Sequence, residues 1–454
     1  MIQIEREHPE YAERKSVWSM YRDLYAGGEQ LKRNAASYLT QRWKEPPEVY
    51  TERLNSVFYE NYIGSIVDWY AATVFRREPL LTFDGVNDAG KLFFYDFTAD
   101  CDLRGTDLTD FLRARLIDAM VQGSSYILAD FPKPSTAAGT KAEEDAAGLS
   151  RAYLVGYTAD EVINWSLDTH GNFEWVVLRT RELCQEPDSD ECPVDTRWTY
   201  FDKQTFQRYR KCGDAGTVTL VDSGTHGMAA QNRVPLFRME MPTGLWLMNK
   251  GGLLQLEHFN KSNALSWALT MGLFAMPVIY SDRDWSQMVG ESYYIQLSPG
   301  DKFGWAEPEG KVYQIASDNL QTLQEEIYRV CYLSQAGGPL SNQGQSGLSK
   351  QRDFSITQEV LRAYGDAAKD VTRRVLTAIE EARQDGLVVG VSGLDEFDIA
   401  DFSSELDDAQ RLLSLGIQSP TMKKQIFKKL AMKYLCDLRQ DVKGQIASEI
   451  DAAS

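Results

Sequence analysis

One segment of this 454-residue chain has residue types and spacing that could hold a nucleotide phosphate: Gly85-Val86-Asn87-Asp88-Ala89-Gly90-Lys91-Leu92. A P-loop needs a Gly-rich turn of backbone N–H groups, a Lys for the terminal phosphates and a hydroxyl at the next position for magnesium. Leu92 stands at that last position and cannot ligate magnesium. Asp84 and Asp88 would also place negative charge beside the phosphates. The pattern therefore favours an ordinary strand-to-helix turn.

The patterns for a nucleophile or a metal are incomplete. Neither Ser346 nor Ser392 completes a Gly-x-Ser-x-Gly turn, and no histidine stands in a His-Glu-x-x-His helix. A zinc site is the weaker alternative to free thiols, because its ligands lack short spacings. Its four ligands would be Cys184, Cys192, Cys212 and His226.

Adjacent acids are a third candidate, for acid/base catalysis or metal binding. Neighbours such as Glu380 and Glu381, or Asp407 and Asp408, diverge by about 100° on a helix, so they would not converge on one ligand. A solvated helix face is favoured. We therefore expect no enzyme, with no catalytic residue, metal or cofactor.

The composition sets the class of protein in which these residues must be placed. Hydrophobic residues make up 43% and charged residues 25%, so the chain is globular and large enough for more than one domain. Lys and Arg number 48 against 66 Asp and Glu, and the resulting net charge of -18 argues against a tight nucleic-acid binder overall. The six scattered cysteines argue against a disulfide framework, and no signal peptide or membrane span is expected, so a reducing cytoplasm fits best.

The N-terminal half is expected to begin with helices and to continue with strands. Apolar residues at a period near 3.6 predict a helix over residues 46–79, which Pro79 ends. Thr106 or Asp107 can cap a second helix that runs to Gly123. Strands are expected over 126–131, 153–157, 174–181, 197–201 and 207–210, with a turn at 169–172 and a loop over 132–150. The fold class is therefore α+β.

Helices dominate from Gly251 onward. The apolar periodicity predicts helices over 253–274, from 318 to the Gly337-Gly338 pair, and over 355–386. The last would span about 45 Å at ~1.5 Å per residue. Short strands and turns are expected over 278–315, and a polar, Gly-rich segment over 337–352 links the second and third helices.

Several stretches, in this order, resemble portal proteins of tailed bacteriophages, the head-to-tail connectors. They are His8-Pro9-Glu10-Tyr11 with Trp18, residues 50–79 ending in Val-Phe-Arg-Arg-Glu-Pro, Gly123-Ser124-Ser125-Tyr126-Ile127-Leu128-Ala129-Asp130-Phe131-Pro132, and Val162-Ile163-Asn164-Trp165. The similarity covers nearly the whole chain, and the order of the segments carries it.

The resemblance implies a division of the chain. The wing would comprise residues 1–248, the two stem helices 249–275 and 317–336, and the clip 276–316. The tunnel loop would comprise residues 337–352. The long wing helix and a returning strand at 396–402 would lie within 353–402, and residues 403–454 would form a small helical crown.

The resemblance also implies a function. The chain would be one subunit of a ring, expected to be a dodecamer, at the portal vertex of the capsid in the virion, assembled in the host cytoplasm. The ring would pass double-stranded DNA during packaging and ejection without reading its sequence. Its partners would be the large terminase subunit, a head-tail adaptor, and the major capsid or scaffolding protein, with no membrane.

Two groups of residues are the candidate contacts. In the tunnel loop, polar side chains could touch the DNA backbone, the alternative being a simple hinge: Asn342, Gln343, Gln345, Lys350, Gln351 and Arg352. In the clip, aromatic side chains could anchor a motor or adaptor, the alternative being packing between or within subunits: Trp285, Tyr293, Tyr294 and Trp305.

The acidic balance suits a conduit on physical grounds. Carboxylates lining a tunnel repel phosphates and leave no deep electrostatic trap, whereas a basic lining would stall the duplex. Two other classes compete with this interpretation: another virion scaffold or adaptor, and a hydrolase that uses paired carboxylates.

Overall fold

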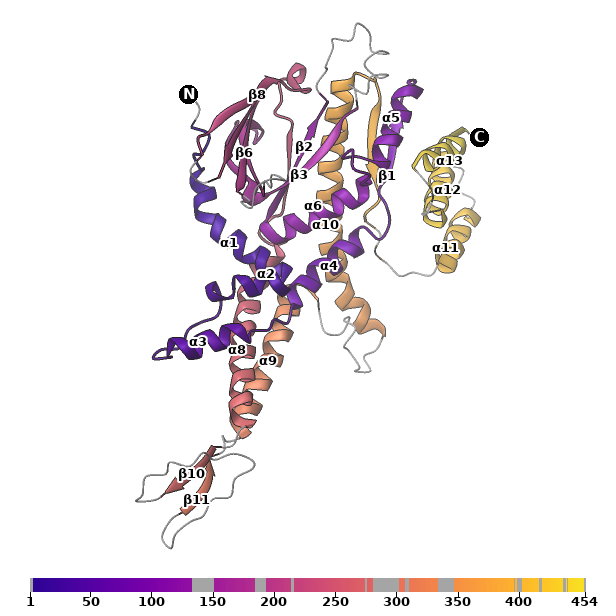
Figure 1. Cartoon of the computed structure of the whole chain (residues 1–454). Helices are drawn as coiled ribbons and strands as arrows, with labels where there is room; N and C mark the ends of the chain where they lie inside the picture. The colour runs from indigo at the N-terminus through magenta and orange to yellow at the C-terminus, as the bar shows by residue number, and fades with distance from the viewer. Residues whose placement is uncertain are drawn as a thin grey trace. The chain divides into compact units, whose positions relative to one another are not determined.

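The computed structural model (Figure 1) describes most of the chain. The described residues are 3–132, 151–183, 193–213, 216–273, 276–280, 302–306, 310–333, 347–395, 397, 402–415, 419–435, 438 and 440–452. The chain folds as two compact units. The larger unit comprises Met1–Arg22, Ser65–Lys250 and Asn342–Ser454, and the second, which we call the hairpin unit, comprises Asp23–Gly64 and Gly251–Ser341.

The fold is α+β, as expected, with helices and separate antiparallel sheets. The larger unit holds a five-stranded meander in which each strand pairs with the next in sequence (Figure 1). Its strands are β4 (Val162–Leu167), β5 (Phe173–Leu183), β6 (Val194–Asp202), β7 (Thr205–Cys212) and β8 (Thr219–Thr225). Val176, Leu178, Phe201 and Phe206 contribute buried side chains to the core on this sheet.

The turn predicted at 169–172 joins β4 to β5. Gly171 has φ 80°, in the left-handed region that glycine adopts without strain. The Asp168 carboxylate accepts hydrogen bonds from the backbone N–H groups of His170 and Asn172 at 2.8 and 2.9 Å. Local polar contacts therefore close this turn, which is why its sequence signal was sufficient.

Two smaller sheets join distant segments of the larger unit. One has the order β3 (Tyr153–Thr158), β2 (Ser124–Asp130), β9 (Leu236–Glu240), and every residue of β2 is buried. The other pairs β1 (Leu80–Asp84) with β12 (Val388–Ser392), from Leu80↔Ser392 to Asp84↔Val388. We expected the returning strand at 396–402; residues 396 and 398–401 lie outside the described residues, and the paired strand is β12.

Helix α6 (Leu108–Gln122) confirms the expected boundaries. The Asp107 side chain accepts a hydrogen bond from the Asp110 backbone N–H at 2.8 Å, and Gly123 ends the helix with φ 84°. Both signals are local, so they could be recognised without the fold.

The longest helix is α10 (Gly347–Arg383), which has 37 residues and packs on β12, β9 and α6. Its buried stripe includes Leu361, Tyr364, Ala368, Val371, Val375 and Ile379, the spacing of one helix face. The helix begins eight residues before the predicted Ser355. Residues 347–352, which were expected to belong to the loop, are therefore helical.

The single helix expected over 46–79 is instead two helices, α3 (Pro47–Asn55) and α4 (Tyr62–Val74). Within the hairpin unit, side chains of α8 (Leu247–Leu273) bind the intervening backbone at Phe58, Glu60 and Ile63. Those tertiary hydrogen bonds compensate for the lost helical ones, and nothing in the apolar period reveals them.

The remaining elements complete the two units. They are α1 (Pro9–Ala26), α2 (Gly28–Arg33), η1 (Ala35–Ser37), α5 (Asp88–Ala99), η2 (Ala159–Glu161), η3 (Ala229–Gln231), β10 (Met276–Tyr280), β11 (Lys302–Ala306), α9 (Gly310–Val330), α11 (Phe402–Ser414), α12 (Pro420–Tyr434) and α13 (Gln440–Ala452). The C-terminal region is helical, as expected. Lys443 of α13 pairs with Glu78 at 2.9 Å, and Gln440 donates to the Pro79 carbonyl at 3.0 Å, beside β1.

No helix in the described part of the chain has the length and apolar character needed to cross a membrane.

Candidate functional site

The hairpin unit contains one long antiparallel hairpin built from α8, β10, β11 and α9 (Figure 1). The Lys261 ammonium donates to the Asn319 side chain at 2.9 Å, and the Tyr313 hydroxyl donates to the Ala268 carbonyl at 3.2 Å. The strands pair from Met276↔Ala306 to Tyr280↔Lys302. The residue numbers of each contacting pair average 290 to 291, so the helices and the strands fold back about the same point of the chain.

Side-chain amides on α8 bind the backbone of the segment between α2 and α4. Gln255 donates to the Glu60 carbonyl at 2.8 Å and accepts from the Ile63 N–H at 3.2 Å. Asn263 does both at Phe58, donating at 3.0 Å and accepting at 3.1 Å. Each amide thus satisfies one carbonyl and one N–H, as a neighbouring strand would.

Asn260 repeats this arrangement one turn away. Its side chain donates to the Tyr38 carbonyl at 3.0 Å and accepts from the Thr40 N–H at 2.8 Å. A buried polar amide is tolerated only when its groups are paired, so these contacts fix the register of the segment on α8.

A buried ion pair fixes the loop that precedes α3. The Arg53 guanidinium donates to both Glu45 carboxylate oxygens at 2.7 Å, and the two side chains are 5% and 3% exposed. The Arg42 backbone N–H donates to the same carboxylate at 2.9 Å. Burial alone would raise the pKa of Glu45, but these two donors outweigh it and hold the pKa below its usual range.

One histidine of the hairpin unit is buried beside a carboxylate. His258 Nε2 lies 3.4 Å from Glu60 Oε2, and its ring meets that of Tyr62 edge to face. Burial lowers the pKa of His258, and Glu60 offsets this only in part. Burial, with the Glu60 charge, raises the pKa of Tyr62 to about 12. The histidine is therefore neutral at pH 7 and serves packing.

The half of the hairpin nearest the strands exposes apolar side chains on both helices. Leu269 of α8 is 44% exposed, and Val312 and Ile315 of α9 are 64% and 61% exposed. Nearer the base, Gln255, His258, Phe259 and Asn263 of α8 are buried, while Leu253 is 63% exposed. Two helices alone cannot cover each other's apolar surface, so this half needs further packing partners.

The exposed face of α9 is acidic. Asp318 accepts from Gln314 at 2.7 Å and Glu325 accepts from Gln321 at 3.1 Å, both neutral donors. Neither carboxylate has an ion pair within the described residues. With Ile315 and Thr322 they lie at i, i+3, i+7 and i+10, which is one side of a helix.

The predicted tunnel-loop residues divide between two settings. Lys350, Gln351 and Arg352 lie on α10, so the expectation of a loop reaching residue 352 is corrected: the helix includes them, because α10 starts at Gly347. Asn342, Gln343 and Gln345 lie outside the described residues.

The predicted clip residues are mostly outside the described part of the chain. This holds for Trp285, Tyr293 and Tyr294, whereas Trp305 lies on β11, paired with Pro277 of β10. The start of α9 at Gly310 also corrects the expected strands and turns, which ran to residue 315.

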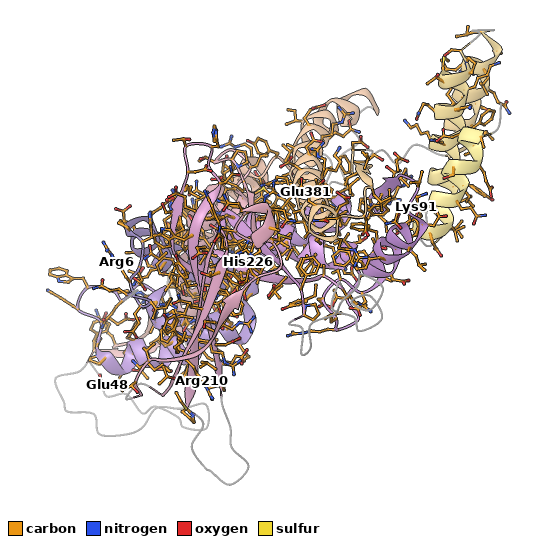
Figure 2. The ribbon with its side chains drawn as sticks, turned by 90° about the horizontal axis from the view of Figure 1, so that it is seen from above. Arg6, Glu48, Lys91, Arg210, His226 and Glu381 are labelled. Atoms are coloured by element: carbon orange, nitrogen blue, oxygen red, sulfur yellow. The ribbon has the colours of Figure 1, made fainter. Side chains whose placement is uncertain are left out.

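The P-loop-like segment forms a capped helix start. The Asn87 side chain accepts from the Gly90 N–H at 3.0 Å, so the amide that a phosphate would need is already bound. The Lys91 ammonium lies 3.3 Å from the Asp88 carboxylate. Figure 2 marks Lys91 on α5 and Glu381 on α10. Asn87 and Asp88 therefore occupy the two groups that would hold a phosphate, and of these two residues only Asp88 was expected to weaken its binding.

Buried carboxylates of the larger unit have arginine partners. Asp195 is fully buried and accepts from Arg197 at 3.0 Å and from Arg210 at 2.9 Å, and Arg383 donates to Asp385 at 2.7 Å. His226 Nε2 lies 2.9 Å from the Asp202 carbonyl. Among the described residues, no group of three or more His, Cys, Asp or Glu side chains could hold a metal ion.

Helix α12 is a basic element that the net charge concealed. It carries five lysines and no acid: Lys423, Lys424, Lys428, Lys429 and Lys433. Lys428 pairs with Asp451 of α13, while Lys423 is exposed and has no ion pair within the described residues. The lysines at 423–433, with no acid among them, were a sequence signal for a basic helix. The net charge of the whole chain hides it.

No protein-family model matches the chain, and no curated protein matches it. Three solved structures align with it at 13% identity. They are the "Neck of empty GTA particle computed with C6 symmetry" (TM-score 0.44, 86% of this chain, 96% of that chain), the "Virion of native gene transfer agent (GTA) particle" (0.41, 86%, 96%) and the "Neck of native GTA particle computed with C12 symmetry" (0.40, 87%, 97%). At such TM-scores they carry no argument about function.

Proposed function

We propose that this chain is one subunit of a ring-shaped portal of a tailed bacteriophage, located at one capsid vertex of the virion. The order of elements supports this: a helix, a strand pair and a returning helix form the hairpin, and a 37-residue helix follows. In this proposal α8 and α9 are the stem, β10 and β11 belong to the clip, and α11 to α13 form the crown.

The observation that carries the proposal is the exposed apolar surface on the half of the hairpin nearest the strands. Leu269, Val312 and Ile315 are exposed on α8 and α9, beyond the part of α8 that binds the segment between α2 and α4. Copies of the same hairpin, arranged around an axis, would bury these side chains. Head-to-tail contacts of this kind close into rings when the rotation between subunits closes.

The charge of the chain supports a conduit. A net charge of -18 would keep DNA from adhering to the wall. Lys350, Gln351 and Arg352 would touch the sugar-phosphate backbone at the narrowest point, without base readout. The ring would dock the large terminase subunit and a head-tail adaptor, and would contact capsid or scaffolding protein.

We further propose that the chain is not an enzyme, and that any ATP hydrolysis belongs to a separate terminase. The competing classes make different predictions. A hydrolase would lose turnover on replacement of one carboxylate without any effect on assembly. Another scaffold or adaptor would assemble without a central channel.

Mass photometry and negative-stain microscopy of the purified protein test the ring. We expect closed rings with a central channel, near twelve subunits, at micromolar concentration. Particles that stay monomeric when concentrated, and also when scaffolding protein is added, would contradict the proposal. Assemblies without a channel would favour the scaffold or adaptor class instead.

A packaging assay tests the tunnel residues. Because α10 begins at Gly347, the segment and the helix can be separated: one variant lacks residues 341–346, and another carries Lys350→Ala and Arg352→Ala. We expect both to form rings and to retain less packaged DNA than the wild type. The matched control, Lys32→Ala with Arg33→Ala, removes two exposed cations of α2 and should package normally. Unchanged packaging in both test variants would remove this role.

A further inference from the structure

Trp43 is the most conspicuous apolar side chain on the surface of the hairpin unit. It is 89% exposed, at the tip of the loop over residues 40–46, which we call the tryptophan loop. Exposure of a large aromatic ring to water is unfavourable, and tryptophan is enriched among residues that dominate the binding energy of interfaces. The loop therefore has the chemistry of an interface anchor.

The tryptophan loop is held in place by the rest of the unit. Glu45, at the end of the loop, forms an ion pair with the buried Arg53. The Thr40 backbone N–H, at its start, donates a hydrogen bond to the Asn260 side chain of α8. The backbone of Lys44, next to Trp43, has φ 66°, a conformation that residues other than glycine rarely adopt. A rigid loop loses little entropy on binding, so a braced and strained presentation of Trp43 favours docking.

The loop also carries exposed positive charge. Arg42 and Lys44 flank Trp43, both are exposed, and neither has an ion pair within the described residues. The Lys44 ammonium lies 4.6 Å from the centre of the Trp43 ring. The surface that fits this loop must therefore offer an apolar spot beside carboxylates.

The exposed face of α9 has that composition. Ile315 is 61% exposed, and Asp318 and Glu325 follow on the same side of the helix. Residues three apart on a helix are neighbours, so Ile315 and Asp318 form one apolar and acidic patch. Lys311 lies one turn closer to β11 and limits the patch at that end.

The loop and the patch lie on opposite sides of the hairpin unit. Gln255, Asn260 and Asn263 face the segment that carries the loop, whereas Lys261 and Ala268 face α9 from roughly the opposite flank of α8. Figure 1 shows α3 on one side of α8 and α9 on the other. The loop cannot reach the α9 of its own chain.

Loop and patch nevertheless lie at the same height along the hairpin. Asn260 binds the start of the loop, and its neighbour Lys261 contacts Asn319, in the middle of α9. A rotation about an axis along the hairpin leaves height unchanged. Two complementary surfaces, on opposite sides and at one height, are what a ring of identical subunits requires.

We propose that Trp43 of one subunit docks on α9 of the next subunit, with its ring against Ile315 and with Arg42 and Lys44 beside Asp318 and Glu325. This inference rests on the proposed ring and assigns one of its subunit contacts. It makes the tryptophan loop a determinant of assembly, independent of DNA.

Cysteine cross-linking tests the contact directly. A variant with Trp43→Cys and Ile315→Cys should, under mild oxidation, give a ladder of covalent oligomers on a non-reducing gel. A mixture of the two single variants should stop at dimers. The control pair, Trp43→Cys with Val86→Cys, uses a fully exposed residue of the larger unit and should give no ladder. Wild-type protein controls for its native cysteines.

Assembly measurements give a second readout. We expect Trp43→Ala to raise the concentration at half-assembly at least tenfold, with an unchanged melting temperature, because the side chain is exposed in the single subunit. Arg42→Glu with Lys44→Glu should also weaken assembly, and adding Asp318→Lys with Glu325→Lys should restore it.

The outcomes separate this contact from the ring itself. The contact would be overturned if the Trp43→Ala protein formed rings normally and the Trp43→Cys, Ile315→Cys protein gave no ladder. The portal proposal would then still stand. Absence of rings and of cross-links in every protein would overturn both. A ladder equal to that of the Val86 control would mark the link as collisional and would also reject the contact.

Discussion

At the scale of single residues, the pair Arg53 and Glu45 is the most consequential buried charge of the hairpin unit. Replacing Arg53 by Met would leave the Glu45 carboxylate buried without its partner. We expect this to reduce the free energy of unfolding by about 1–3 kcal/mol. Urea unfolding followed by tryptophan fluorescence measures it.

The matched control removes both charges. Arg53→Met with Glu45→Met leaves no orphaned ion, so most of the lost stability should return. A single variant as stable as the wild type would show that water reaches Glu45. Because the pKa of Glu45 is lowered on folding, its contribution is present above the ordinary value and lost as pH falls through the lowered one.

His258 predicts a second pH dependence, at higher pH. Its folded pKa is lowered by burial, so between that value and the ordinary ~6.5 the unfolded chain binds a proton that the folded chain does not. Stability should therefore fall as pH drops from about 7.5 to 5.5. His258→Gln should make the melting temperature less sensitive to pH over this range.

His226 is also buried with a lowered pKa and contributes its own slope, so the difference between variant and wild type isolates His258. Equal slopes in the two proteins would refute the role assigned to His258.

At the scale of elements, Gly365 decides how closely α10 approaches the chain after β12. A Cβ at this position would lie 1.9 Å from the Leu394 carbonyl oxygen. Alanine normally stabilises a helix relative to glycine by about 0.5–1 kcal/mol. We expect Gly365→Ala to have the opposite sign here and to destabilise by about 1–3 kcal/mol, because backbone must move.

The control is Gly244→Ala, where an added Cβ meets nothing within 4 Å. It should change the unfolding free energy by less than about 0.5 kcal/mol. Thermal and urea unfolding of the two variants side by side measure the contrast. Stabilisation by Gly365→Ala would mean that α10 can shift away from Leu394.

At the scale of the whole molecule, the exposed apolar side chains of the hairpin should govern assembly. Val312→Glu places a charge on a surface that the proposed ring buries, so we expect at least tenfold weaker assembly with little change in monomer melting. Val86→Glu alters a fully exposed valine of the larger unit and should assemble normally. Mass photometry over a concentration series compares them, and equal assembly would place Val312 outside any interface.

Local signals in the amino-acid sequence were sufficient to predict several structural elements. The Asp107 cap and Gly123 end of α6, the turn at Gly171 and the failure of a P-loop at Leu92 depend on neighbouring residues, so they could be inferred without a fold. Apolar periodicity likewise located α8, α10 and three strands of the meander, β5, β6 and β7, but it did not predict β4 or β8. The α+β class and the portal resemblance followed from the order of these elements.

Contacts between distant residues settled the rest. The break between α3 and α4 depends on amides of α8 that lie about 200 residues away, and the pairing of β1 with β12 joins segments more than 300 residues apart. The same holds for Trp43: its sequence shows only an aromatic residue between two cations, and its role emerges from Arg53 and Asn260. Helical caps and turns are encoded in adjacent residues, whereas register, burial and exposure arise only when the folded chain brings remote groups together.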